Sequence, residues 1–132
     1  NKLTESFNNI KKKYFDLSSA IGYETWIRMS TRPRDWHRDH DDRLEMTTGE
    51  LKYPICTTCY YPYVADDVKD GRLCFENGTI VLPKTNRMVF FGPDVYHNVE
   101  KFTGERISIL LNPWNEALCQ TPCHDPWRRY MV

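Results

Sequence analysis

The sequence lacks both a net charge and a long hydrophobic stretch. It holds 18 Lys and Arg residues against 18 Asp and Glu residues, so no overall field draws it to a nucleic acid or another polyanion. No apolar run approaches the ~18 residues that a membrane-spanning helix needs, and no signal-peptide pattern stands at the start of the sequence. We therefore expect a cytoplasmic protein with neither a nucleic-acid nor a membrane partner.

The sequence also lacks the cysteine pattern of a disulfide scaffold. Its cysteines are odd in number and the chain is large for such a scaffold, so reduced thiols are expected. Cys56 and Cys59 have the spacing of zinc ligands, but they fall in a predicted strand, where residues three apart face opposite sides. This argues against zinc. A disulfide between Cys119 or Cys123 and another of the thiols, which include Cys74, stays open without a preferred partner.

Length and periodicity predict one domain that begins with a helix. At 132 residues the chain has room for a single core, spanning residues 1–132, and its aromatic content of 14% favours a β-rich fold. Phe7, Ile10, Tyr14 and Leu17 recur at helical spacing, and Gly22 follows as a stop signal. We expect a helix over residues 4–20 that packs one face on a sheet.

The rest of the chain shows short strands separated by turn signals. Strands are predicted at residues 26–29, 54–61, 72–75, 79–82, 87–91, 96–100 and 105–111, within a β core of residues 23–114. Asn77-Gly78 is the strongest hairpin signal, and Asn112-Pro113 is expected to end the last strand. Residues 44–52 are expected to form a polar loop and residues 115–132 an irregular tail. One helix followed by about eight strands predicts a mainly β, antiparallel sandwich or barrel.

The segment Trp36-His37-Arg38-Asp39 carries the clearest chemical signal. A His-x-Asp pair on an extended segment places both side chains on one face, roughly 7 Å apart along the strand. Both can then reach one metal ion, and His97 from a distant strand would complete a set of two histidines and one carboxylate. That set leaves coordination positions open and is the one found at non-haem Fe(II) sites.

The strands on either side of Thr103-Gly104 suggest which residues share a pocket. If this dipeptide forms a two-residue turn, His97 lies opposite Leu110 and Lys101 opposite Arg106. One face would then carry His97, Val99, Arg106, Ser108 and Leu110. The other would carry Ile107, Ile109 and Leu111, an apolar face that the N-terminal helix could cover.

These motifs resemble the Fe(II)/2-oxoglutarate-dependent dioxygenases, especially their prolyl-4-hydroxylase-like branch. The matching pieces are His37-x-Asp39, His97 and Arg106-x-Ser108, in that order on predicted strands, with Pro83 and the segment after it as further support. The resemblance covers roughly residues 26–114. It implies a double-stranded β-helix, or jelly roll, of about eight strands with Fe(II) at its open end.

The resemblance also implies roles for single residues. His37, Asp39 and His97 would hold Fe(II), while Arg106 and Ser108 would bind 2-oxoglutarate; Tyr60 is a weaker candidate for the same cosubstrate. Trp36 and Arg38 would line the substrate pocket. Because His40 and Asp42 repeat the His-x-Asp pattern, they remain an alternative metal pair.

The implied activity is hydroxylation of a C–H bond with O2, releasing succinate and CO2. The substrate would be a peptidyl residue such as proline, or a small molecule of amino-acid type, contacted by residues 43–52 and 64–71. Two other classes stay open: a cupin-like metal enzyme that does not use 2-oxoglutarate, and an inactive β-barrel binding module. The sequence leaves the substrate and the oligomeric state undetermined.

Overall fold

The computed structural model describes residues 2–118 and 129–131, and most of its strands form two antiparallel sheets. One sheet is ordered β11 (Arg129–Met131), β1 (Gly22–Arg28), β10 (Arg106–Trp114), β3 (Thr57–Val64) and β7 (Arg87–Phe91). The other is ordered β2 (Arg34–His37), β8 (His97–Val99), β5 (Leu73–Phe75) and β6 (Ile80–Val81). A small third sheet pairs β4 (Lys69–Asp70) with β9 (Phe102–Thr103).

The strand order defines the fold class. When β11 and the two strands of the small third sheet are set aside, β1, β2, β3, β5, β6, β7, β8 and β10 remain. Renumbered from 1 to 8 along the chain, they are ordered 1-8-3-6 in the larger sheet and 2-7-4-5 in the other. This is the order of a jelly roll, or double-stranded β-helix. The predicted mainly β fold is therefore confirmed. The hairpin at Asn77-Gly78 is confirmed as well, since it joins β5 to β6 with Leu73 opposite Val81.

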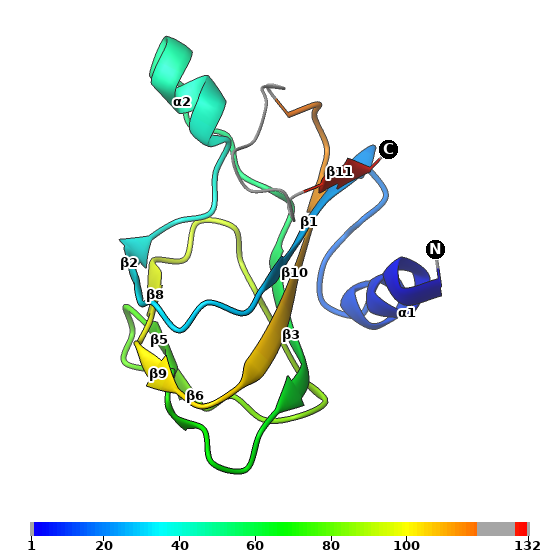
Figure 1. Cartoon of the computed structure of the whole chain (residues 1–132). Coiled ribbons are helices and arrows are strands. Elements are labelled where there is room, and N and C mark those ends of the chain that lie inside the picture. The colour runs from blue at the N-terminus through cyan, green and yellow to red at the C-terminus, as the bar shows by residue number, and fades with distance from the viewer. Residues whose placement is uncertain (1, 119–128, 132) are drawn as a thin grey trace.

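The N-terminal helix covers the outer face of the larger sheet (Figure 1). Helix α1 (Lys2–Lys11) buries Phe7, whose ring meets Tyr60 edge-on at a centroid distance of 5.3 Å, and Asn8 donates a hydrogen bond to the Tyr23 hydroxyl. The helix ends earlier than the expected residue 20. Lys11 turns inward and donates to the Leu111 carbonyl, and a local turn closed by Asp16 and Ser18 competes with further helical bonds.

A second helix, α2 (Asp42–Thr48), replaces the polar loop expected at residues 44–52. Asp41 caps its N-terminus by accepting from the Leu44 amide, and Gly49 ends it in the left-handed conformation. Asp41 and Gly49 are both visible in the sequence as helix-capping residues, but they define a helix of only seven residues. Within the described ranges, no helix is long and apolar enough to cross a membrane.

The last long strand and the tail also differ from the expectation. Strand β10 continues through Pro113 to Trp114. Proline has no N–H to donate, but at Pro113 this position lies beyond the last β10–β3 residue pair, so no ladder hydrogen bond is lost there. The Pro113 carbonyl accepts from the Ile55 amide on the same side of the strand. Residues 129–131 form β11 beside β1, so the tail is not irregular throughout. Cys119 and Cys123 lie outside the described residues. Cys56, Cys59 and Cys74 are free thiols.

The predicted hairpin across Thr103-Gly104 is wrong. Strand β8 pairs with β2 and β5, whereas β10 pairs with β1 and β3, so His97 and Leu110 belong to different sheets. The chain crosses between the sheets through β9. The expected grouping still arises by this other route, since His97, Val99, Arg106, Ser108 and Leu110 all line one cavity between the sheets.

Candidate metal centre and its cavities

The two sheets enclose an inner cavity of about 40 Å³. Strands β1, β3, β7 and β10 of the larger sheet supply one wall, and β2, β5 and β8 of the other sheet supply the opposite one. The apolar side chains that line it are Trp26, Leu73, Phe91, Val99 and Leu110. The polar and ionisable lining residues are Arg28, Arg34, His37, Asp39, Thr57, Cys59, Tyr61, His97, Arg106 and Ser108.

His37, Asp39 and His97 converge at one end of this cavity. His37 and His97 are direct cross-strand partners of β2 and β8, with ring centroids 4.3 Å apart. Asp39 follows just after β2, and its Oδ1 and Oδ2 lie 3.5 Å from His37 Nε2 and 3.6 Å from His97 Nε2. One ligand atom from each residue lies within 4.8 Å of the others. Metal–ligand bonds of about 2 Å give separations of this size.

Backbone carbonyls set the orientation of both imidazoles. The Asp35 carbonyl lies 2.6 Å from His37 Nδ1, and the Val95 carbonyl lies 2.8 Å from His97 Nδ1. A carbonyl only accepts, so each Nδ1 carries the hydrogen and donates it. In the neutral rings, both Nε2 lone pairs then point toward the Asp39 carboxylate. This is the orientation of metal-bound histidines, and a cation among the three groups would relieve their mutual repulsion.

Burial and neighbouring charges act in opposite directions on this group. Burial raises the pKa of Asp39, but its contact with His37, the charges of both histidines and the hydrogen bond from Thr57 outweigh it, so the pKa lies below its ordinary value. Thr57 Oγ1 donates to Asp39 Oδ2 over 3.0 Å. For His97, burial lowers the pKa despite the opposing effect of Asp39. Both shifts favour the forms that bind a cation: a carboxylate and a neutral imidazole.

Arg106 lies in the same cavity on β10 of the larger sheet, whereas His37 and His97 lie on the other sheet. Its side chain is buried, with only 3% of the residue exposed, and stacks on Phe102 with the guanidinium carbon 4.0 Å from the ring centroid. Nη1 donates to the Gly71 carbonyl over 2.6 Å. Among the described residues, no carboxylate lies within ion-pair distance of it. Ser108, two residues along the strand, donates to the Arg28 carbonyl.

Strand alternation excludes Tyr60 from the cavity. Its ring packs under α1 against Phe7 and its hydroxyl donates to Asn86, so the expectation that it binds the cosubstrate is wrong. The neighbours Cys59 and Tyr61 point inward instead. The sequence showed that these residues alternate but not which face was inner.

Trp36 and Arg38 take positions outside the inner cavity. Trp36 is 43% exposed and stacks on Tyr96, so it does not wall the site as expected. Arg38 lies over the other part of the same Tyr96 ring and donates to the Asp94 carbonyl. Arg38 does line a neighbouring outer cavity of about 250 Å³, together with His37, Asp39 and His40.

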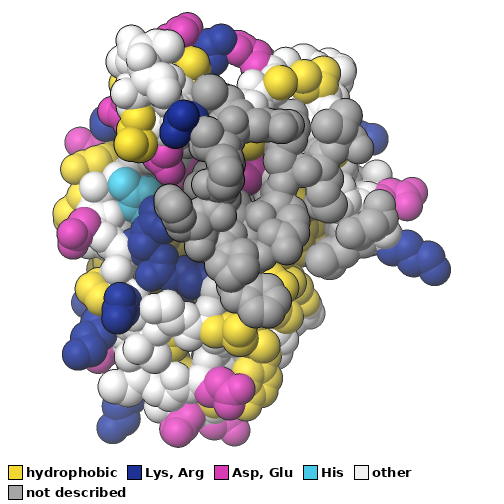
Figure 2. All heavy atoms as spheres, turned by 45° about the horizontal axis from the view of Figure 1, so that its top comes forward, with side chains coloured by type: hydrophobic (Ala, Val, Ile, Leu, Met, Phe, Trp, Pro, Cys, Tyr) yellow, Lys and Arg dark blue, Asp and Glu magenta, His cyan; other side chains and the backbone are white. Residues whose placement is uncertain are grey.

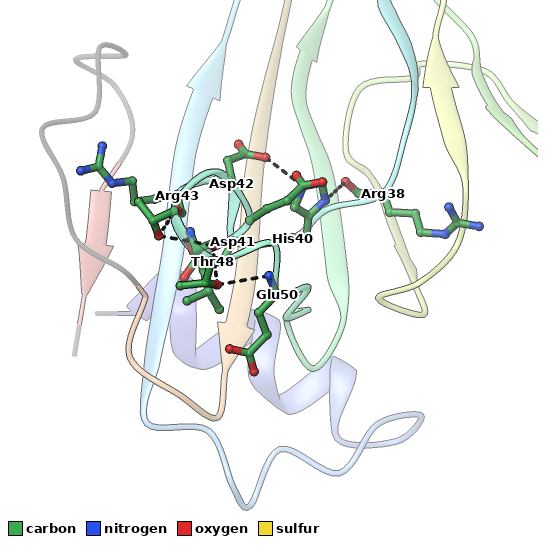
Figure 3. A network of polar contacts seen from close by, with 10 residues as sticks. Arg38, His40, Asp41, Asp42, Arg43, Thr48 and Glu50 are labelled. Atoms are coloured by element: carbon green, nitrogen blue, oxygen red, sulfur yellow. Dashed lines mark hydrogen bonds and ion pairs between the residues drawn. The ribbon is translucent and has the colours of Figure 1, made fainter.

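The second His-x-Asp pair forms its own cluster at the start of α2. His40 Nε2 lies 2.5 Å from Glu45 Oε2 and 3.4 Å from Asp42 Oδ1, while His40 Nδ1 lies 3.1 Å from the Arg38 carbonyl (Figure 3). Both ring nitrogens thus have oxygen acceptors at hydrogen-bond distance. The Asp42 and Glu45 side chains are largely exposed.

Arginines gather beside the metal candidates on the surface. A cleft of about 360 Å³ is lined by Trp26, Arg28, Ser30, Arg32, Pro33 and Arg34. Figure 2 shows a histidine side chain next to a group of Lys and Arg side chains on the face that it presents. The sequence motifs did not indicate Trp26 or Arg28 as site residues, and they left open whether the strand face that carries Thr57 points inward. The alternation Glu24-x-Trp26-x-Arg28 was the available signal, because it places one apolar and two charged side chains on the same face.

No family model matches the sequence, and no curated protein sequence matches it. Among solved structures, the chain is similar to the crystal structure of a cupin-2 domain containing protein from Shewanella frigidimarina NCIMB 400. The TM-score is 0.44 at 13% identity, over 81% of this chain and 91% of that one. The assignment to the jelly-roll class stands on the strand order of this chain.

Proposed function

We propose that this protein is an Fe(II)- and 2-oxoglutarate-dependent oxygenase that hydroxylates a C–H bond. Two features of one cavity support the proposal. One is the converging group of His37, Asp39 and His97, and the other is the buried guanidinium of Arg106. The sequence resemblance to the prolyl-4-hydroxylase-like branch rests on these same residues.

The donor set suits Fe(II). Two neutral imidazoles and one carboxylate match the facial set of non-haem Fe(II) sites and leave other positions open. The carbonyls of Asp35 and Val95 hold the histidine rings, and Thr57 holds the carboxylate. Such supporting hydrogen bonds fix ligand orientation before the metal arrives. When bound, Fe(II) with 2-oxoglutarate and O2 supplies the oxidising chemistry, releasing succinate and CO2.

The observation that carries the cosubstrate assignment is Arg106. A buried cation without a counter-ion is costly, and among the described residues Arg106 has a carbonyl partner but no acid. An arginine fork pairs well with a carboxylate. Arg106 would bind the distal carboxylate of 2-oxoglutarate, and Ser108 would donate to the same carboxylate by turning its hydroxyl away from the Arg28 carbonyl. The apolar lining between them and the metal group would exclude water from the chain of the cosubstrate.

Anaerobic titration of the protein with Fe(II) and 2-oxoglutarate tests this assignment. We expect a weak visible charge-transfer band in the wild type, its loss in His97→Ala, and its retention in the matched variant His40→Ala. Arg106→Ala should need about ten- to a hundred-fold more 2-oxoglutarate, the loss expected for one charge-assisted hydrogen-bond pair. Circular dichroism checks folding. A well-folded wild type without the band contradicts the proposal.

The small inner cavity favours a second candidate, a jelly-roll metal enzyme that does not use 2-oxoglutarate. Its volume of about 40 Å³ holds one or two waters, so 2-oxoglutarate could reach Arg106 only if lining side chains moved. In this candidate, Arg106 is a structural residue that joins Gly71 and Phe102. The same titration separates the two, because metal would then bind tightly with no band on adding 2-oxoglutarate.

A further inference from the structure

Three cavities meet at one pair of side chains. Trp26 on β1 and Arg34 on β2 line the inner cavity, the outer cavity beside His40, and the arginine-lined cleft. Neither residue belongs to the proposed set of metal and cosubstrate ligands. A molecule that enters from the surface and reaches the metal group therefore passes an indole and a guanidinium.

The cleft has charge of one sign. Its ionisable lining residues are Arg28, Arg32 and Arg34, with no acidic residue among them. The side chains of Arg32 and Arg34 make no hydrogen bond or ion pair to any residue that the structure describes. Since guanidinium groups bind carboxylates and phosphates in two-point geometry, this lining selects an oxyanion.

Local contacts hold the cleft in shape. Arg28 Nη2 donates to the Arg32 carbonyl over 2.8 Å, and the Arg32 amide donates to Ser30 Oγ over 3.2 Å. The Phe102 amide also donates to the Thr31 carbonyl, which ties the turn to β9. Pro33 restricts the backbone directly before Arg34. The turn is thus ordered before a ligand binds, which lowers the entropy cost of binding.

The net charge of the site after metal and cosubstrate binding also favours an anionic substrate. A divalent metal with Asp39 carries one net positive charge and Arg106 carries another, and the two carboxylates of 2-oxoglutarate offset them. In the cleft, Arg28, Arg32 and Arg34 are then the ionisable lining residues, and the acidic residues near Arg34 line the outer cavity instead. Arg34 and His37 are three residues apart on β2, about 10 Å along the strand. An anion at Arg34 and a carbon at the metal group can therefore belong to one small molecule.

We propose that Trp26, Arg32 and Arg34 form the binding subsite for the anionic group of the primary substrate, which is a small carboxylate or phosphate with an apolar part against Trp26. This inference rests on the proposed oxygenase function and narrows its substrate class. A neutral prolyl peptide has no group that matches this subsite.

The test uses the whole chain without metal and three probes of one shape: benzoate, phenyl phosphate and neutral benzyl alcohol. Calorimetric titration should show saturable binding of the anions and none of the alcohol. Arg34→Gln should raise the Kd of the tighter anion about ten-fold or more, and Arg32→Gln several-fold. Arg43→Gln, a matched exposed arginine on α2, should leave it within about two-fold. The anion that binds more tightly identifies the class of oxyanion.

Three results would overturn the subsite: benzyl alcohol binding as tightly as the anions, Arg34→Gln binding like the wild type, or Arg43→Gln losing as much as Arg34→Gln. The Fe(II)/2-oxoglutarate band, measured on the same variants, keeps the two proposals distinct. Arg34→Gln should retain the band at unchanged cosubstrate concentration. If it loses 2-oxoglutarate as Arg106→Ala does, Arg34 belongs to the cosubstrate site and the subsite is refuted. If the wild type lacks the band yet binds the anions through Arg34, only the oxygenase assignment fails.

Discussion

The two His-x-Asp pairs lie three residues apart in sequence but differ in the burial of the aspartate and in the contacts of its partners. Asp39 is 11% exposed, lies between the sheets, and has two imidazole Nε2 atoms beyond hydrogen-bond distance but at ligand spacing. Asp42 is 64% exposed and begins a short helix, where His40 already contacts Glu45 directly. The inner cluster gathers unsatisfied lone pairs around one point, whereas the outer cluster satisfies its own polar atoms.

The difference shows that a ligand motif acquires its chemistry from the strands that face it. His37 lies beside His97 because β2 pairs with β8, and Asp39 accepts a hydrogen bond from Thr57 at the start of β3. His40 lies beyond the end of β2, where its ring contacts Asp42 and Glu45 of α2, the Arg38 carbonyl and the Tyr53 ring (Figure 3). We therefore expect the two clusters to respond differently to the same substitutions.

The largest contrast should appear in metal affinity. Asp39→Ala removes the one carboxylate among the three converging ligands and should weaken Fe(II) or Mn(II) binding by about a hundred-fold or more. Asp42→Ala should change it by less than about two-fold. Calorimetric titration of both variants with Mn(II) checks this. Equal losses in the two variants would place the metal at neither cluster alone, and a loss only in Asp42→Ala would reverse the assignment.

Whether Arg106 acts together with the inner cluster can be tested through Gly71. A Cβ there would lie 2.7 Å from Arg106 Nη1 and 2.8 Å from Phe102 Cβ, at a φ of +74°. Gly71→Ala should destabilise the fold by about 2 kcal/mol or more and displace the guanidinium. We expect about a ten-fold rise in the 2-oxoglutarate needed for the visible band.

Gly78→Ala is the matched control for this substitution. Gly78 has a similar φ of +88° but no atom within 4 Å of the added Cβ. It should show the backbone strain in urea unfolding without any change in cosubstrate binding. Equal cosubstrate losses in the two variants would mean that Arg106 is not held by Gly71 for binding.

A smaller effect is expected at the residue that orients Asp39. Thr57→Val keeps the shape of the side chain but removes its hydrogen bond to Oδ2, which should weaken Mn(II) binding about ten-fold. Thr57→Ser should restore most of the affinity. Glu45→Gln in the outer cluster should have no measurable effect on the same titration. Full affinity in Thr57→Val would show that Asp39 is held without this bond.

The smallest effect concerns pH and the metal-free protein. Burial lowers the pKa of His97 below its ordinary value of 6.5, so the unfolded chain takes up this proton at higher pH than the folded chain. Stability should therefore fall as pH decreases through 6.5 and level off once the folded ring is protonated. Urea unfolding at several pH values checks this. His97→Gln should show a shallower fall, and an unchanged slope would mean that other groups cause it.

The sequence did not indicate which face of a strand points into the cavity or which strands pair with each other. Tyr60 and Tyr61 are equally good strand residues, and only the docking of Phe7 on Tyr60 makes Tyr61 the inner one. Likewise, the turn residues around Gly104 favoured a hairpin, but the chain instead crosses from one sheet to the other. Both choices depend on contacts between segments far apart in the chain.

The sequence alone determined the mainly β class, the hairpin at Asn77-Gly78, and the short set of residues that could bind a metal. These follow from alternation, turn chemistry and donor type, which are local properties. Tertiary structure alone decided that His37 rather than His40 faces His97 and that Arg34 stands where three cavities meet. A one-residue change of register would reverse every such facing, and only packing between distant strands fixes that register.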